Sequence, residues 1–142
     1  MEVNKVAVAG LWELGHNVPL QEAYLWEMVV RDFEVDEWHM HPVTGIDQPR
    51  VIEWADAGAM LSALRERYFL VFVTEGAPCY LSEFKHPENA CYVFGKCNWS
   101  PFTSFAEPGD LSLCIETPAG DGLLWPHQCL GIAMWHRRSQ WP

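Results

Sequence analysis

Histidines are the side chains in this sequence with the clearest capacity for chemistry. His39 and His41 alternate along a predicted strand, so their imidazoles are expected on one face. Such a pair can bind a metal ion, but no third ligand has suitable spacing, and structural zinc sites use four ligands. We therefore expect no metal site.

His127 falls in the first turn of the last predicted helix. A histidine side chain titrates near neutral pH, so it can act as a general base. The alternative is a polar residue at a helix end that only contacts solvent, which is common for histidine. Cys97 is a second reactive candidate, but a thiol needs a lowered pKa to become a nucleophile, and only Lys96 stands beside it.

Strand and helix patterns alternate along the chain, which predicts an α/β domain with a mostly parallel sheet. The predicted strands cover residues 6–9, 38–40, 69–73, 90–94 and 111–115, and the fourth stops at Gly95. The predicted helices run from Asn17 or Val18 to Arg31, with Pro19 in the first turn, from Trp54 to Arg67, and from Pro126 onward. Their predicted buried faces are Ala23, Trp26, Val30 and Phe33, then Ala57, Met60, Leu61 and Leu64, then Leu130, Ala133 and Met134. Residues 44–50 and 117–122 are predicted loops.

The composition indicates one globular domain. The chain has 142 residues, of which 49% are hydrophobic, so a packed core is expected. The longest apolar run, 68–73, is far below the roughly 18 residues that a membrane span requires. The first residues lack the pattern of a signal peptide, and we expect a soluble cytoplasmic protein. The five cysteines form no C-x-x-C pair and are expected as buried free thiols: Cys79, Cys91, Cys97, Cys114 and Cys129.

The formal net charge of −10 opposes a broad nucleic-acid-binding face, because such faces are usually basic. The few basic residues can still form local patches. Arg65 lies close to Arg67 in the sequence, and His136 is followed by two arginines. If RNA is a partner, we expect it to be held by such a patch or in the groove of a dimer.

Several blocks, in order along nearly the whole chain, carry a resemblance to a known family. The most specific block is HPENACYVFG, residues 86–95. It is joined by residues 15–18, 35–39, 113–118 and 129–137, of which the last combines small residues with an aromatic and a base. Together these blocks resemble the SpoU branch of the SPOUT superfamily, the S-adenosylmethionine-dependent RNA methyltransferases.

The resemblance implies a SPOUT-type α/β fold with a C-terminal trefoil knot, a homodimer crossed by RNA, and methyl transfer to a ribose 2′-hydroxyl of transfer or ribosomal RNA. By position, it implies that Thr74, Gly95, Ile115 and Leu124 line the S-adenosylmethionine site. Gly95 has a physical rationale, because a residue without Cβ lets its backbone approach a ligand closely. The alternative for Gly95 is a simple turn at the end of a strand.

The sequence differs from the family at the positions whose polar side chains carry out catalysis in the family's motifs. The first motif normally reads Asn-x-Gly-x-x-x-Arg. Here Asn17 is kept, Pro19 replaces the glycine, Ala23 stands at the arginine, and Arg31 is the only basic residue nearby. The second motif has Cys97 for its glutamate and Ser100 for its later glycine, and Leu123-Leu124-Trp125 replaces the Ser-Leu-Asn of the third. The candidate catalytic residues are therefore Asn17, Arg31 and His127.

Three tryptophans fall in loops that the implied knot would bring together: Trp12, Trp99 and Trp125. Their rings could stack on a base or on adenine, or they could fill the core and an interface. Two functional hypotheses follow. The chain is an RNA ribose 2′-O-methyltransferase with an altered active site, or it is a catalytically degenerate SPOUT-fold protein that binds cofactor, RNA or protein as a dimer.

Overall fold

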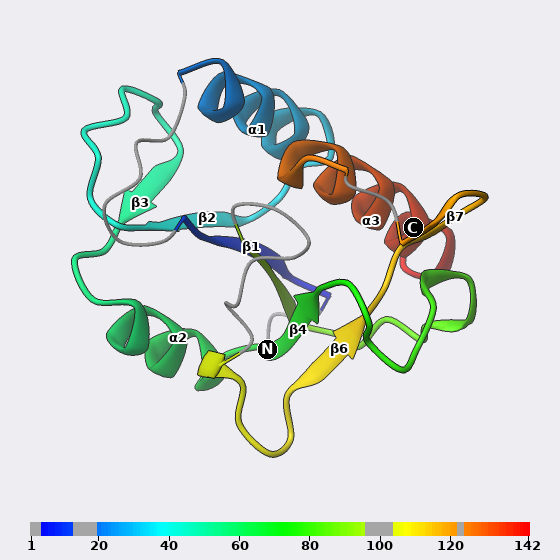
Figure 1. The fold of residues 1–142 in the computed structure, drawn as a ribbon. Helices are drawn as coiled ribbons and strands as arrows, with labels where there is room; N and C mark the ends of the chain where they lie inside the picture. The colour runs from blue at the N-terminus through cyan, green and yellow to red at the C-terminus, as the bar shows by residue number, and fades with distance from the viewer. Residues whose placement is uncertain (1–3, 13–19, 96–103, 122–123) are drawn as a thin grey trace.

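A six-stranded sheet, in which every strand pairing is parallel, forms the centre of the molecule (Figure 1). The computed structural model describes residues 4–12, 20–95, 104–121 and 124–142. The strand order is β3-β2-β1-β5-β4-β6. These strands are β1 (Val6–Leu11), β2 (Glu37–His41), β3 (Val51–Glu53), β4 (Phe69–Val73), β5 (Ala90–Gly95) and β6 (Leu111–Leu113). The predicted α/β class with a mostly parallel sheet is confirmed.

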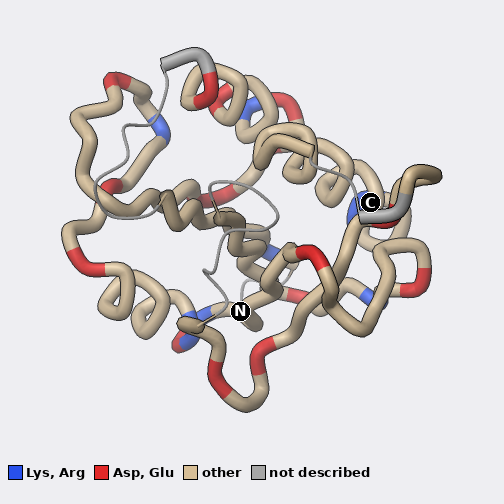
Figure 2. The backbone as a smooth tube through the Cα atoms, in the orientation of Figure 1, with Lys and Arg blue, Asp and Glu red and all other residues tan. Residues whose placement is uncertain are grey.

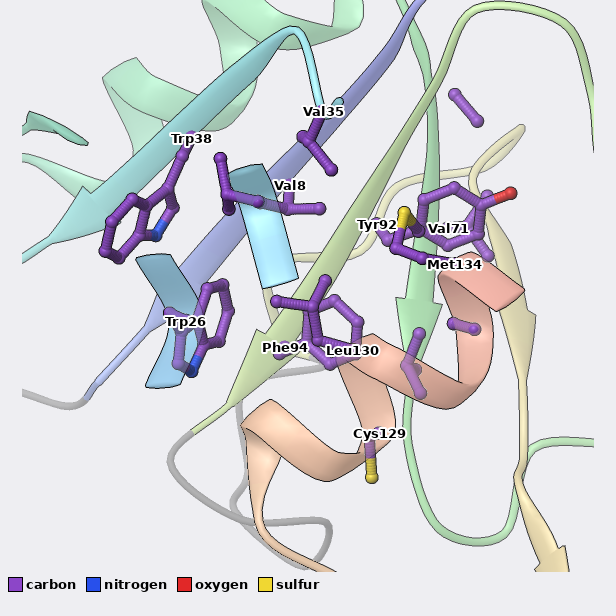
Figure 3. Packing of buried hydrophobic residues seen from close by; sticks show 14 of the residues in the cluster. Val8, Trp26, Val35, Trp38, Val71, Tyr92, Phe94, Cys129, Leu130 and Met134 are labelled. Carbon is purple, nitrogen blue, oxygen red and sulfur yellow. The ribbon is translucent and has the colours of Figure 1, made fainter. Parts of the chain in front are cut away.

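Helices cover both faces of the sheet and make three layers. Helices α1 (Leu20–Asp32) and α3 (Pro126–Gln140) pack side by side on one face, and α2 (Ala57–Arg65) covers the other (Figure 1). The first face buries Trp26 and Leu130 against β5 (Figure 3), and the second face buries the predicted stripe of α2. The predicted inner residues of α3, which are Leu130, Ala133 and Met134, are all buried. In α1, Ala23, Trp26 and Val30 are buried, whereas Phe33 follows the helix and is only partly buried.

Several predicted boundaries need correction. Strand β3 was not predicted, because three residues at a sheet edge are too few to show a period. Trp54 does not begin a helix: its backbone N–H donates to the Met40 carbonyl at 2.8 Å, and α2 starts after Asp56, whose side chain caps the helix by accepting from the Ala59 N–H. The predicted loop 117–122 contains all but the first residue of a small hairpin, β7 (Glu116–Thr117) with β8 (Gly120–Asp121).

The predicted strand 111–115 is shorter than expected. Strand β6 ends at Leu113, and Cys114 then makes an isolated parallel bridge to Tyr80. The predicted start of the first helix, at Asn17 or Val18, lies outside the described residues. No described helix is both long and apolar enough to cross a membrane. The described cysteines are free thiols, and of these Cys79 is only partly buried; Cys97 lies outside the described residues.

A directional hydrogen-bond chain fixes the C-terminal part of α3 to β5. Arg137 donates from Nη1 to the Tyr92 hydroxyl at 3.1 Å, so the tyrosine proton points to Nδ1 of His86 at 2.5 Å. Nε2 of His86 then donates to Nδ1 of His136 at 2.7 Å. His86 is buried, and desolvation, followed by the charges of His136 and Arg137, lowers its pKa to about 4. A second proton on His86 would leave the Tyr92 hydroxyl without an acceptor.

We predict that His86 makes the protein less stable in mild acid. In the unfolded chain the histidine becomes protonated below about pH 6.5, whereas in the folded protein His86 becomes protonated only near pH 4. The free energy of unfolding should therefore fall as pH falls through this window, by at most about 1.4 kcal/mol per pH unit from this residue. Urea unfolding between about pH 7 and pH 4.5 measures the slope, which should be shallower in His86→Asn.

Part of the slope should persist in the variant, because burial also lowers the pKa of His39. Equal slopes in the wild-type protein and in His86→Asn would contradict the prediction.

Candidate functional site

Three strands of the sheet end side by side, and the segments that follow them form one edge. Val73 of β4 pairs with Phe94 of β5 and with Leu113 of β6. Thr74 continues this contact by donating its backbone N–H to the Leu113 carbonyl at 2.9 Å. All three strands run in the same direction, so their carboxyl ends meet at one edge, where open parallel sheets usually bind ligands.

Three of the four predicted cofactor residues come together at this carboxyl edge. Thr74 follows β4, Gly95 ends β5 opposite Leu11 of β1, and Ile115 lies two residues after β6. Ile115 is buried in the core cluster between the sheet and the helices α1 and α3. Leu124, the fourth predicted position, packs partly buried against the same cluster.

The segment after β4 folds back on the segment after β6. The backbone N–H of Cys114 donates to the Cys79 carbonyl at 2.8 Å, and the Leu81 N–H donates to the Cys114 carbonyl at 2.9 Å. These bonds hold the loop that begins at Thr74 against the chain that leads to Ile115. The two predicted cofactor-lining segments are thus fixed by backbone contacts, which tolerate changes of side chain.

His127 lies at the start of α3, where it contacts a carboxylate that sequence reasoning missed. Its Nδ1 is 2.7 Å from Oε2 of Glu22, and its backbone N–H donates to Oε1 at 3.1 Å. Glu22 belongs to the first turn of α1, and its side chain is only 4% exposed. Glu22 lies 105 residues before His127 and belongs to no motif, so nothing in the sequence indicated that the two residues pair. His127 is therefore engaged by a buried acid rather than by solvent alone.

Tryptophans form a rigid support beneath the Glu22 carboxylate. Trp26 donates from Nε1 to Oε1 of Glu22 at 3.2 Å and stacks on Trp38 with ring centroids 5.9 Å apart. The ring centroids of Trp26 and Trp12 are 5.9 Å apart. Trp26 also meets Phe94 edge-on, with centroids 5.5 Å apart (Figure 3). Phe94 directly precedes Gly95, so the support reaches from the His127 contact to the end of β5.

The tryptophans were expected either to stack on a base or to fill the core, and the two that the structure describes differ in this respect. Trp12 is fully packed in the core, and its ring folds over Gly10, where an added Cβ would lie 2.2 Å from the indole nitrogen. Trp125 is 54% exposed beside the first turn of α3, so a ring face remains available there. Trp99 lies outside the described residues.

Of the other two candidate catalytic residues, only Arg31 lies within the described residues, and it is not brought to His127. Arg31 lies in the last turn of α1, about 14 Å along the helix axis from Glu22, where its Nε contacts Asp32 at 3.0 Å. Asn17, like Cys97, Ser100 and Leu123 of the family motifs, lies outside the described residues. Ala23, at the position of the family arginine, is buried in the core.

His39 and His41 share one face of β2 as expected, but both contact Trp54. Nδ1 of His39 accepts from the Trp54 indole at 2.9 Å, and Nδ1 of His41 lies 3.1 Å from the Trp54 carbonyl. Nε2 of His39 contacts Glu37, whose pKa is lowered to about 2, chiefly by hydrogen bonds from Arg67. Within the described residues, no group of three or more His, Cys, Asp or Glu side chains could hold a metal ion.

The basic residues that could have formed an RNA patch are mostly paired. Arg65 bonds Asp110 and Glu107, and Arg67 bonds Glu37. Arg137 is buried and donates to the Tyr92 hydroxyl, which contacts His86. Acidic positions are spread along the chain, whereas basic positions are few (Figure 2). A basic groove built from these residues is therefore not present in one chain.

Comparisons with known proteins find structures but no sequence relatives. No protein-family model matches the chain, and neither does any curated protein. A structure of the SpoU methyltransferase AviRb from Streptomyces viridochromogenes, in complex with the cofactor AdoMet, superposes with a TM-score of 0.79 at 10% identity, covering 99% of this chain and 62% of that one. The A. aeolicus TrmH/SpoU tRNA modifying enzyme gives 0.73 at 12% identity, covering 96% and 75%.

A third structure, described for the "2-OH methylation of C/U34 on tRNA", gives a TM-score of 0.72 at 14% identity and covers 97% of both chains. At such low identities the structural similarity establishes the fold alone. The match extends over nearly the whole chain, and it agrees with the resemblance of the sequence blocks. The chain therefore has the fold of the SpoU RNA methyltransferases.

Proposed function

We propose that this protein is an S-adenosylmethionine-dependent RNA methyltransferase that acts on a ribose 2′-hydroxyl of transfer or ribosomal RNA. The observation that carries the proposal is the meeting of Thr74, Gly95 and Ile115 at the carboxyl edge of the parallel sheet. Two structural neighbours are described with AdoMet and with 2-OH methylation of tRNA. An RNA substrate also supports a cytoplasmic location.

The residues at this edge fit such a cofactor. Gly95 carries no side chain, so its backbone is open to close approach. Ile115 and Leu124 supply apolar surface of the kind that lines small-molecule sites, and Trp125 offers an exposed ring face to a purine. The backbone contacts between the segments after β4 and β6 keep these groups in place.

The chemistry divides between the cofactor and the chain. S-adenosylmethionine supplies a methyl group on a positively charged sulfur. The residues of the carboxyl edge hold the reacting atoms in line and exclude water, which is where most of the rate enhancement of a positioned transfer arises. A group on the protein must accept the hydroxyl proton, and of the candidates Asn17, Arg31 and His127, His127 is the one described beside Leu124 and Trp125.

A second candidate function is a catalytically degenerate protein that binds cofactor, RNA or protein. The pairing of Arg65 and Arg67 with acidic side chains favours it, because these arginines lack a free charge for phosphate. Transfer of tritium from labelled S-adenosylmethionine to unfractionated tRNA separates the two functions. The degenerate protein would transfer none.

We also propose a homodimer and a trefoil knot in the last third of the chain. The dimer is supported by two apolar side chains exposed on one face of α3: Trp135 is 68% exposed, and Ile132, three residues before it, is 38% exposed. A spacing of three residues places them on the same side of the helix. Such an exposed apolar patch fits a second copy of the chain.

The first test is calorimetric titration with S-adenosylmethionine. The wild-type protein should bind, and Gly95→Val should lose binding, because its side chain would occupy the space where the backbone approaches the ligand. Gly131→Ala, in α3, is the control: its Cβ would first meet the Val29 side chain of α1 at 4.0 Å, an ordinary van der Waals distance. No binding by the wild-type protein would sink the methyltransferase proposal.

The second test is the oligomeric state of Trp135→Glu. A charge in the centre of the apolar face should abolish the dimer, measured by sedimentation equilibrium, while the circular dichroism spectrum is kept. Phe69→Glu is the control, because Phe69 is also a large apolar side chain, 58% exposed, that lies at the start of β4 and not on α3. A monomeric wild-type protein, or a dimer that survives Trp135→Glu, would argue against this interface.

A further inference from the structure

Glu22 is held by three donors in a way that fixes its orientation. Oε1 accepts from the indole of Trp26 at 3.2 Å and from the backbone N–H of His127 at 3.1 Å. Oε2 faces Nδ1 of His127 at 2.7 Å. The carboxylate comes from the first turn of α1 and meets the first turn of α3, where the partial positive charge of a helix N-terminus favours an anion.

The contact determines which nitrogen of His127 can take a proton. An ionised carboxylate only accepts hydrogen bonds, so Nδ1 must carry the hydrogen that points to Oε2. In the neutral imidazole, Nε2 then carries the lone pair. The His127 side chain keeps 23% of its surface exposed, so a ligand can reach the ring. The pair therefore has the arrangement of a general base with a buried orienting acid.

The position of the pair matches the candidate cofactor site. His127 follows Leu124, one of the predicted cofactor-lining residues, by three residues and the exposed Trp125 by two. On the other side, Trp26 joins Glu22 to Phe94, the residue before Gly95. The place of the family arginine is taken by Ala23, which is buried and has no proton acceptor. Among the candidate bases within the described residues, His127 is thus linked through Glu22 and Trp26 to the end of β5, whereas Arg31 lies at the far end of α1.

We propose that His127 accepts the proton of the hydroxyl that becomes methylated and that Glu22 is its positioning residue; this inference rests on the proposed function. The hydroxyl oxygen forms a bond to the methyl carbon, and the carbon–sulfur bond breaks with its electron pair kept by sulfur. The hydroxyl proton passes to Nε2 of His127. The resulting imidazolium is stabilised by the Glu22 carboxylate at Nδ1.

The alternative is that Glu22 only caps α3 and ties it to α1. Glu22→Gln separates these roles, because the amide oxygen can still accept from the Trp26 indole and the His127 N–H. Its NH₂ group then faces Nδ1 and donates, which forces the hydrogen onto Nε2 and removes the lone pair. A cap would survive this change, whereas a positioned base would not.

The test combines a spectroscopic readout with activity. Nitrogen-15 NMR of histidine-labelled protein without cofactor reports the tautomer, and tritium transfer to unfractionated tRNA reports catalysis. We expect an Nδ1–H tautomer of His127 in the wild-type protein and an Nε2–H tautomer in Glu22→Gln. Glu22→Gln and His127→Gln should each bind S-adenosylmethionine like the wild-type protein and transfer methyl groups at least about 100-fold more slowly.

Glu27→Gln is the matched control, because Glu27 is a buried acid on the same helix that pairs with Arg50 instead. It should keep both the tautomer and the transfer rate. An Nε2–H tautomer in the wild-type protein would overturn the positioning role. Wild-type rates in His127→Gln would overturn the catalytic role while leaving the methyltransferase in place.

A failure of the proposed function gives a different result. If the wild-type protein neither binds S-adenosylmethionine nor transfers its methyl group, the catalytic role of His127 falls with the function. The tautomers still decide whether Glu22 orients the ring, because that measurement needs no cofactor.

Discussion

Strands β1 and β5 pair in parallel at the centre of the sheet, in register from Val6 with Ala90 to Leu11 with Gly95. Each strand is buried nearly throughout, so each needs cover on both faces, and the helices α1, α2 and α3 provide it. Parallel pairing also requires each strand to be followed by a return across the molecule. This single constraint brings the carboxyl ends of the strands to one edge and the first turn of α1 to the same edge.

A buried carboxylate links the two helices that cover the first face. Burying the Glu22 charge is costly unless hydrogen bonds satisfy it, and both of its oxygens are satisfied here. The contact orients a histidine and at the same time fixes the N-terminus of α3 against α1. Stability and chemical competence therefore depend on the same group, which is common where a site is built into a core.

The sequence allowed the framework to be predicted better than the site. The runs 69–73 and 90–94 are apolar without interruption, and the stripe of α2 has a helical period, so their structures follow from local pattern. Strand β3 is too short for a period, and Trp54, which follows it, is held by a backbone bond to Met40 of β2 that composition does not reveal.

The positions of Thr74, Gly95 and Ile115 followed from the family resemblance together with the parallel sheet. The Glu22 partner of His127 could not be predicted, because tertiary packing alone brings these residues together. For the arginines, sequence proximity was misleading. Arg65 and Arg67 suggested a basic patch, but each forms an ion pair with an acidic side chain that is distant in the sequence.

Helix α3 is anchored at both ends by buried polar groups, Glu22 at its start and the Tyr92–His86 pair near its finish. Its 15 residues form a rod of about 22 Å. A rod clamped at both ends transmits an axial push instead of absorbing it by bending. Displacement of the first turn of α3 by a ligand would therefore be transmitted along the helix to the His86–His136 contact near its C-terminal end.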